Sequence, residues 1–145
     1  MEMEIVFPGG KKVDALIGND RIRTDQMVAA GGDGSAPAPF ALFLASIGTC
    51  AGIYVLGFCQ SRGISTEGIK IIQKMSHNPV TKLIDQIELE ILLPSDFPEH
   101  YKSAVIKSAQ LCAVKKHLEN PPDFNITTKT VDAENVYEKA AVAAY

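Results

Sequence analysis

Residues 39–61 read PFALFLASIGTCAGIYVLGFCQS and contain no charged side chain. Pro39 suits the first position of a helix, because the N–H that proline lacks would have no partner there. Arg62 and Gly63 follow the run, and a basic residue before a glycine is typical of a helix C-terminus. The sequence therefore predicts a helix over Phe40–Ser61, about 22 residues and roughly 33 Å long.

An apolar helix of this length needs cover on every side. It could cross a bilayer by length, but Ser46, Gly48 and Thr49 dilute its hydropathy and we expect no membrane span. One domain of 145 residues has difficulty enclosing such a helix, so we expect a second subunit. Gly48 and Gly52, four residues apart, would let the backbone of that subunit approach closely. The alternative, which we favour less, is that these glycines accommodate a strand or loop of the same chain.

The remaining elements are predicted from turn residues and hydrophobic periodicity. Short strands precede and follow the long helix, and strands joined by short turns pair antiparallel. A second helix should carry Cys112 on its apolar face, and an alanine-rich helix or frayed tail should close the chain. We expect a single α+β domain over residues 1–145, with a largely antiparallel sheet, a long buried central helix and a second, cysteine-bearing helix. The predicted strands are 2–7, 11–17, 21–25, 69–77, 82–93 and 124–131, the second helix runs from about 95 to 118, and the tail is 132–145.

Charge and cysteine content exclude several classes of function. The net charge is -3, so the chain lacks the basic surface that nucleic acids require. A secreted disulfide scaffold has many cysteines in an even number, whereas this chain has only three, which indicates a reducing compartment. The first residues show no basic start followed by an apolar stretch, as a signal peptide would. We therefore expect a cytoplasmic protein that binds neither nucleic acid nor membrane.

The cysteines are the candidate reactive groups. Cys50 and Cys59 lie nine residues apart on one helix, so they point in opposite directions and cannot form a disulfide with each other. Cys112 could face Cys50, although buried cysteines more often serve as small apolar side chains. A reactive thiol needs a lowered pKa, and the predicted helix offers Cys50 no cation. Arg21 and Arg23, on one face of a strand, are the candidate cations, unless they form a solvated strand face.

Other motifs are weaker. Gly31-Gly32-Asp33-Gly34 precedes a helix, as anion-binding loops do, but the dinucleotide fingerprint and the Walker lysine are absent, so we expect no phosphate site. The three histidines are scattered, and only His117 lies near a cysteine in sequence. Because no ligand set has metal-binding spacing, we expect neither a metal nor a cofactor.

Two segments resemble a known family. Residues 34–50, GSAPAPFALFLASIGTC, and residues 112–118, CAVKKHL, are similar to the two cysteine motifs of the osmotically inducible protein C (OsmC) family, which includes the organic hydroperoxide resistance (Ohr) proteins. The resemblance extends over nearly the whole chain, from the first strands to Val131. It implies an intertwined homodimer with the long helices at its centre and a peroxidase site at the boundary between the subunits.

The resemblance also implies roles for individual residues. Cys50 matches the thiolate that attacks the peroxide and becomes a sulfenic acid, and Cys112 matches the thiol that condenses with it into a disulfide. A dithiol such as dihydrolipoamide, or a small thiol, would regenerate both cysteines. Arg23, or alternatively Arg21, is the candidate for the family's catalytic arginine. The implied activity is the reduction of organic hydroperoxides in oxidative-stress defence.

The chain departs from the family pattern at three positions. Phe40 stands where typical hydroperoxide reductases have the glutamate that orients their arginine, and Ala113 and Lys115 replace a proline and a serine. Phe40 makes the expected pocket less polar. The alternative function is therefore that of a divergent member that binds a small hydrophobic ligand at the dimer interface, with largely structural cysteines. A membrane-anchored structural protein is a third, less favoured class.

Overall fold

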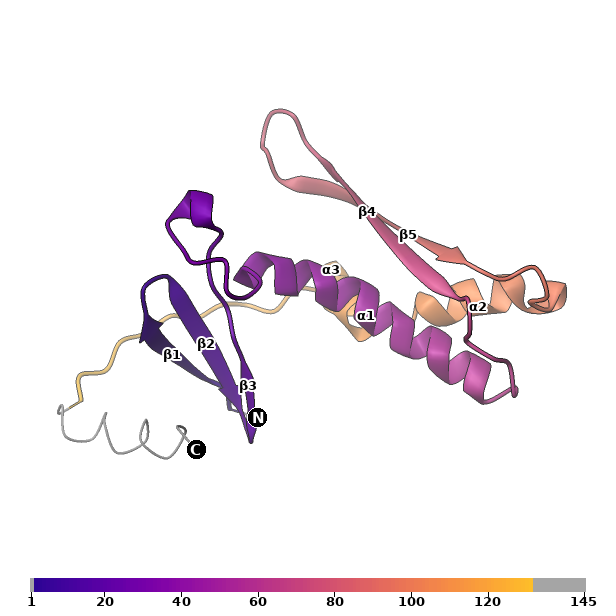
Figure 1. The fold of residues 1–145 in the computed structure, drawn as a ribbon, viewed down its shortest axis with the longest axis horizontal. Helices are drawn as coiled ribbons and strands as arrows, with labels where there is room; N and C mark the ends of the chain where they lie inside the picture. The colour runs from indigo at the N-terminus through magenta and orange to yellow at the C-terminus, as the bar shows by residue number, and fades with distance from the viewer. Residues whose placement is uncertain (1, 132–145) are drawn as a thin grey trace.

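The fold is α+β and is built along one long helix (Figure 1). The computed structural model describes residues 2–131 of the chain. Within them a three-stranded antiparallel sheet, β1-β2-β3, comes first, and a two-stranded antiparallel hairpin, β4-β5, follows the long helix. The elements are β1 (Glu4–Gly9), β2 (Lys12–Ile17), β3 (Asp20–Ile22), α1 (Pro39–Gln60), β4 (Lys70–His77), β5 (Ile84–Leu92), α2 (Lys102–Ala109) and α3 (Ala113–Glu119), with short 3-10 turns at Val28–Ala30 and Glu99–Tyr101.

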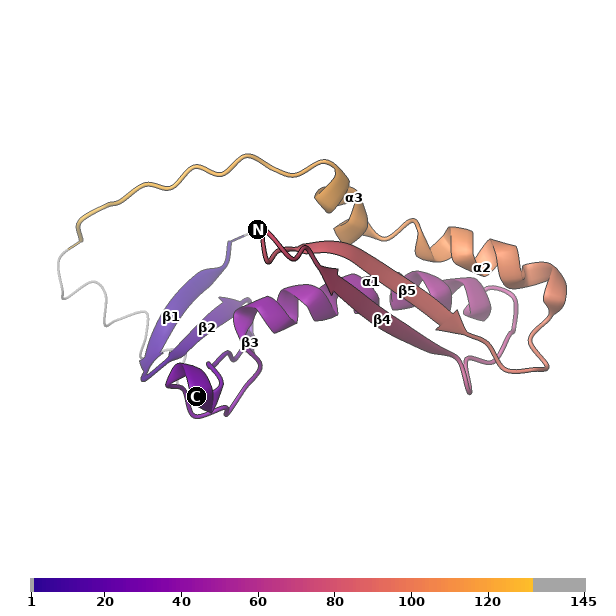
Figure 2. The same ribbon diagram turned by 90° about the horizontal axis from the view of Figure 1, so that it is seen from above.

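Helix α1 confirms the prediction from the uncharged run, with Pro39 in its first turn and Gln60 at its end. One side of α1 packs against α2 and the hairpin (Figure 2). Every fourth residue on that side is buried, as a helix with one covered face requires: Ile47, Ala51, Val55 and Cys59. Val55 and Cys59 form the core together with Phe97 and Val105.

Gly48 and Gly52 accommodate β4 of the same chain, so the expectation that they face a second subunit is wrong. A Cβ atom on Gly48 would lie 2.8 Å from the Gln73 side-chain oxygen, and one on Gly52 would lie 3.8 Å from Ile71. The Gln73 amide donates a hydrogen bond of 3.0 Å to the Leu44 carbonyl, which draws β4 against the helix. Gly48 therefore permits close helix–strand packing within one chain, whereas a side-chain carbon at Gly52 would make an ordinary contact.

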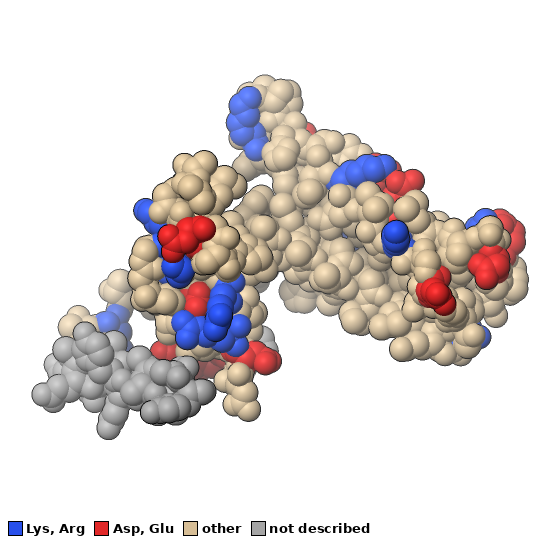
Figure 3. Space-filling model, viewed as in Figure 1, with Lys and Arg blue, Asp and Glu red and all other residues tan. Residues whose placement is uncertain are grey.

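The opposite side of α1 is exposed. Its outermost residues also recur every four positions, and all are uncharged: Ala41, Ala45, Thr49, Ile53 and Gly57. Only 28% of the most apolar 18-residue stretch is buried, and by length and composition alone α1 could span a membrane. In Figure 3 the charged side chains gather over the strand meander and toward the far end, and the region between them is largely uncharged. The expected burial of α1 on all sides is thus not achieved within one chain.

Four further details of the prediction are wrong. The second helix does not run unbroken to Leu118, because it is interrupted after Ala109 and resumes as α3. Residues 124–131 form no strand, since a strand requires a ladder partner and none of the described residues pairs with this segment. The predicted single sheet is two sheets, and β3 ends at Ile22 instead of residue 25. The predicted alanine-rich tail, 132–145, lies outside the described residues.

A buried carboxylate fixes the loop between β3 and α1. Asp25 is 1% exposed and accepts four hydrogen bonds: from the backbone N–H of Gln26 at 2.8 Å, of Asp33 at 3.2 Å and of Ser35 at 3.0 Å, and from the Ser35 hydroxyl at 2.7 Å. A Cβ on Gly32 would lie 2.0 Å from the Gln26 carbonyl oxygen, so only glycine fits there. The N–H groups of this loop are already engaged, that of Asp33 by Asp25 and those of the three glycines by backbone carbonyl groups, so they are not available to an external anion.

We expect Asp25→Ala to destabilise the protein, lowering its melting temperature by roughly 5 °C or more, because several donors lose a charged acceptor. The donors from Ser35 and neighbouring amides lower the Asp25 pKa to about 2. Because the pKa of Asp25 is lower in the folded protein, its carboxylate stabilises the fold at pH values above its ordinary pKa of 3.8. This contribution is lost as the pH falls toward 2. Thermal melts between pH 2 and 7 measure both effects. Asp33→Ala, an exposed carboxylate of the same loop, is the matched control, and identical melts for both variants would contradict the role of Asp25.

Candidate functional site

The site begins at the interruption between α2 and α3. Residues 110–112 leave the helical path, and Cys112, with φ -47° and ψ 124°, becomes the residue that precedes α3. The prediction that Cys112 lies on the face of a continuous helix is therefore wrong. The interruption turns the first backbone N–H groups of α3 toward α1. The Cys112 side chain is buried at 2% exposure, and its sulfur lies 3.9 Å from the carbonyl oxygen of Ile47 on α1.

Cys50 and Cys112 are brought together at this point. The backbone N–H of Val114 lowers the pKa of the Cys50 thiol, and hydrogen bonds from the Cys112 side chain and from the N–H of Ala113 act in the same direction against partial desolvation. Burial raises the pKa of Cys112, and its hydrogen bond to Cys50 raises it further. Cys50 is therefore the thiol that ionises first, and Cys112 is the one that stays protonated. This is the polarity of a nucleophilic thiolate with a neighbouring thiol.

This difference predicts selective alkylation. Because only the thiolate reacts, we expect iodoacetamide to modify Cys50 with a half-maximal rate at a pH below 9.0, the ordinary value for a thiol. Peptide mass spectrometry over a pH series gives the midpoint for each cysteine. Cys112→Ala should raise the pH midpoint for Cys50 alkylation, because it removes a group that lowers the Cys50 pKa. Cys59→Ala should leave this midpoint unchanged, because Cys59 is not among the groups that shift the Cys50 pKa. A Cys50 midpoint at or above 9.0 would contradict the arrangement.

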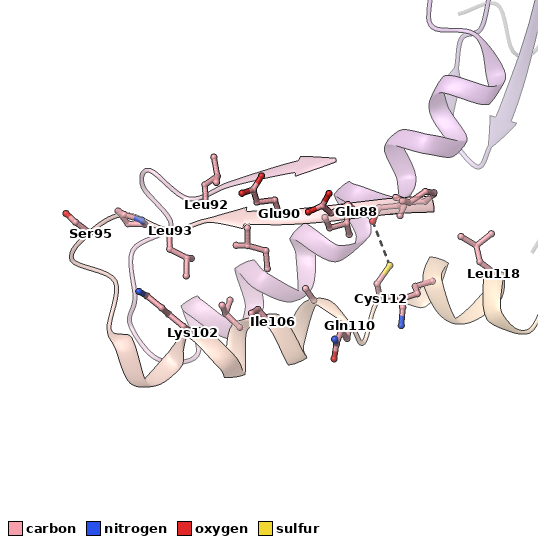
Figure 4. Close-up of a pocket in the computed structure, with 18 residues that line it drawn as sticks. Glu88, Glu90, Leu92, Leu93, Ser95, Lys102, Ile106, Gln110, Cys112 and Leu118 are labelled. Atoms are coloured by element: carbon pink, nitrogen blue, oxygen red, sulfur yellow. Dashed lines mark hydrogen bonds between the residues drawn. The ribbon is translucent and has the colours of Figure 1, made fainter. Parts of the chain in front are cut away.

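A large groove reaches Cys112 from the side of the hairpin. It measures about 880 Å³ and lies between β5 and α2. Its walls are mostly aliphatic, with Leu93 and Ile106 at the middle, and Lys102 and Gln110 lie at its edge (Figure 4). Cys112 lies at one end, where the dashed line in Figure 4 marks its contact with α1. A ligand in this groove would thus approach Cys112 and not Cys50.

A second cavity of about 530 Å³ lies between α1, α3 and the segment after α3. Ala113 and Val114 line it, and these are the residues whose N–H groups act on Cys50. Phe43 contributes from α1, and its ring stacks with Phe40 at a centroid distance of 5.6 Å. The departure from the family glutamate at Phe40 therefore lies close to an apolar cavity.

The arginines do not meet Cys50 within one chain. Arg21 forms an ion pair with buried Asp14, with its Nε atom 2.8 Å from Oδ2. Arg23 is exposed beyond the end of β3. Neither is among the groups that shift the Cys50 pKa. Cys59 lies in the core, where burial raises its pKa. Among residues 2–131 no three His, Cys, Asp or Glu side chains are grouped as metal ligands would be.

Sequence reasoning missed the contribution of the backbone. The Ala113 and Val114 amides reach Cys50 only because the chain leaves the helix at Cys112. No glycine or proline in residues 109–113 signals this interruption. Leu111 continues the apolar pattern in the sequence, and only the structure shows that it is 51% exposed.

These features define the class of protein: an α+β domain built around a long cysteine-bearing helix, to which the connection between two shorter helices delivers a second cysteine. The family model of OsmC-like proteins matches residues 32–127, so the chain belongs to the OsmC-like protein family. A search among curated proteins gives no match to this chain.

Solved structures share this fold. The chain is similar to an osmotic stress induced and detoxification response protein from Psychrobacter arcticus, with a TM-score of 0.61 at 20% identity over 79% of this chain and 85% of that one. An OsmC-like protein from Mycoplasma pneumoniae gives 0.62 at 15% identity, over 83% and 87% of the two chains. The organic hydroperoxide resistance protein OsmC from Legionella pneumophila gives 0.50 at 16%, over 81% and 87%. These likenesses establish the fold.

Proposed function

We propose that this single OsmC-like domain of residues 1–145 is a cytoplasmic thiol-dependent peroxidase that reduces organic hydroperoxides in oxidative-stress defence. The observation that carries the proposal is the unequal pair of thiols, with the pKa of Cys50 lowered and that of Cys112 raised by mutual contact and by their surroundings. The solved Legionella structure is described as a hydroperoxide resistance and redox protein, and this agrees with the chemistry of the pair.

The proposed reaction has three steps. The Cys50 thiolate attacks the terminal oxygen of ROOH, the O–O bond breaks, and the alkoxide takes a proton from water to leave as ROH, with Cys50 oxidised to a sulfenic acid. The Cys112 sulfur then attacks the Cys50 sulfur, and the sulfenic hydroxyl leaves with the thiol proton as water. A dithiol such as dihydrolipoamide reduces the resulting disulfide through a mixed disulfide, becomes a cyclic disulfide itself and returns both protons.

A homodimer accounts for the exposed side of α1. Only 28% of the most apolar 18-residue stretch of α1 is buried, and an exposed apolar face of this kind is typical of a protein–protein interface. The exposed strip from Ala41 to Gly57 consists mostly of small side chains, so a second α1 could pack closely against it. OsmC family members are generally oligomeric, and the second protomer would cover this strip.

Arg23 is the cation that we propose for the site. Arg21 is engaged by Asp14, and Arg23 is exposed. The strand meander that carries it lies beyond the first turn of α1 (Figure 1), so an intertwined dimer could bring it to a Cys50 thiolate. A guanidinium would remain charged there at any relevant pH.

The alternative function is binding of a small hydrophobic ligand without turnover. The stacked rings of Phe40 and Phe43 beside an apolar cavity favour it, because the carboxylate expected at position 40 is replaced by an apolar surface. In that case both cysteines would be structural.

Consumption of cumene hydroperoxide in the presence of dihydrolipoamide tests the proposal. The expected result is catalytic turnover, together with a Cys50–Cys112 disulfide when one equivalent of hydroperoxide is added without reductant. Absence of both reactions in the folded protein would exclude the peroxidase and leave the binding protein.

A further inference from the structure

His117 lies one helical turn beyond the amides that act on Cys50. It belongs to α3 and follows Ala113 by four residues, so the two lie on the same face of the helix. The Nδ1 atom of His117 is 2.8 Å from the Ala113 carbonyl oxygen. Because a carbonyl oxygen only accepts hydrogen bonds, Nδ1 carries the proton and is the donor. The imidazole ring is therefore bonded to the backbone at the start of α3.

One peptide group connects this histidine to the reactive thiol. The Ala113 carbonyl and the Val114 N–H belong to the same planar amide, in which they point in opposite directions. The Val114 N–H is the group that lowers the pKa of Cys50 most, and the carbonyl at the other end of the amide receives the His117 ring. Imidazole, amide and thiol thus form a continuous chain.

The way in which Cys50 is activated makes this chain relevant. Within residues 2–131 the groups that lower its pKa are the N–H groups of Val114 and Ala113 and the Cys112 side chain, and none of these is a cation. The acidity of Cys50 therefore depends on the strength of uncharged donors. Hydrogen bonds in a chain polarise one another, by about 10–30% per bond, so a donor on the Ala113 carbonyl makes the Val114 N–H a stronger donor.

We propose that His117 is a positioning residue for the Cys50 nucleophile: its Nδ1–H group fixes and polarises the Ala113–Val114 peptide group, whose N–H acts on Cys50. As a role in catalysis this inference rests on the proposed peroxidase function, whereas the effect on the thiol can be measured without turnover.

The same segment contains a second bond of this kind, which indicates a conservative variant. The Asn120 Nδ2 atom lies 3.4 Å from the carbonyl oxygen of Lys116, four residues earlier. A side-chain amide can thus donate to the backbone across one turn. Asparagine at position 117 should therefore preserve the donor, whereas leucine should remove it.

The alkylation midpoint of Cys50 tests the inference. We expect His117→Leu to raise the pH of half-maximal alkylation by about 0.3–0.5 unit, because one polarising bond of the chain is lost. Leucine has a higher helix propensity than histidine, so a loosened α3 would not account for this shift. His117→Asn should keep the midpoint of the parent protein. His77→Leu, a matched change at an exposed histidine of β4, should leave the midpoint unchanged as well.

Three results would overturn the inference. The first is an unchanged midpoint in His117→Leu. The second is an equal rise in His117→Asn, which would assign the effect to the shape of the ring and not to its donor. The third comes from a ¹⁵N NMR spectrum of the parent protein in mildly alkaline solution, where imidazole is neutral: the His117 proton should reside on Nδ1, and a proton on Nε2 would show that the bond to Ala113 does not form.

The pH profile of turnover separates this inference from the proposed function. In His117→Leu the profile of kcat/KM for cumene hydroperoxide should move to higher pH by the same amount as the alkylation midpoint, while its limiting value at high pH stays within about twofold of the parent value. A fall in the limiting value without a shift would make His117 merely structural and overturn the inference. The expected midpoint shift in a protein that shows no turnover would keep the effect of His117 on the thiol and exclude the peroxidase. Turnover with an unchanged midpoint would keep the peroxidase and exclude the role of His117.

Discussion

Replacing Cys50 by serine is expected to abolish dithiol-dependent hydroperoxide consumption, with the initial rate falling by about three orders of magnitude or more. The serine hydroxyl stays protonated at neutral pH and is a much weaker nucleophile than a thiolate. The donors at Val114 and Cys112 would then have no anion to stabilise. The measurement is the rate of cumene hydroperoxide loss with dihydrolipoamide in excess.

Two companion variants make this result specific. Cys112→Ser should still consume one equivalent of hydroperoxide but then accumulate the Cys50 sulfenic acid, which a cyclic 1,3-dione traps for mass spectrometry. Cys59→Ala, in the core and outside the thiol pair, should retain the parent rate. A Cys50→Ser protein that keeps its rate would contradict the assignment of the nucleophile. An equal loss in Cys59→Ala would show that the assay reports unfolding.

Ile53→Glu is expected to dissociate the proposed dimer. Ile53 is 65% exposed on the outer strip of α1, and a second α1 packed there would bury the new carboxylate beside its own copy. A like-charge pair in an apolar interface costs several kcal/mol, which raises the dissociation constant by roughly a hundredfold or more. Analytical ultracentrifugation over a dilution series measures the change.

A polar position on another element serves as the control for Ile53→Glu. Ser103 is exposed on α2, and Ser103→Glu adds the same charge without placing it on the strip. The control should sediment as the parent protein does. If Ile53→Glu also sediments as the parent dimer, the subunits meet elsewhere and the outer strip is not the interface. If the parent protein sediments as a monomer, no dimer exists at that concentration.

The fold was predictable wherever local pattern alone decides the structure. The uncharged run predicted α1 to within one residue at each end, because Pro39 and the Arg62-Gly63 pair mark its limits. The antiparallel pairing of neighbouring strands followed from their short turns. The strand over 124–131 was wrong because β-propensity describes a side-chain pattern, whereas a strand exists only where a partner supplies the ladder. Gly48 was misassigned since sequence cannot say which backbone will approach it.

The proximity of the two cysteines was predictable as a possibility, but their electrostatics were not. The spacing left Cys50 and Cys112 as possible neighbours, and in the structure each thiol is close enough to shift the pKa of the other. The sequence directed attention to arginines for the activation of Cys50, because amide groups leave no signature in side-chain patterns. Their contribution depends on where the helix breaks, and at the break Cys112 contacts Ile47, which is 65 residues away in the chain.

The turn at residues 110–112 positions two groups at once. It places the Cys112 sulfur and, one and two residues later, the amides that lower the pKa of Cys50. Under the proposed mechanism, a sequence change that moved this turn would alter the strength of the nucleophile and the formation of the cross-link together. Evolution could then not tune attack and resolution as separate traits, and variants of the turn should gain or lose both at once.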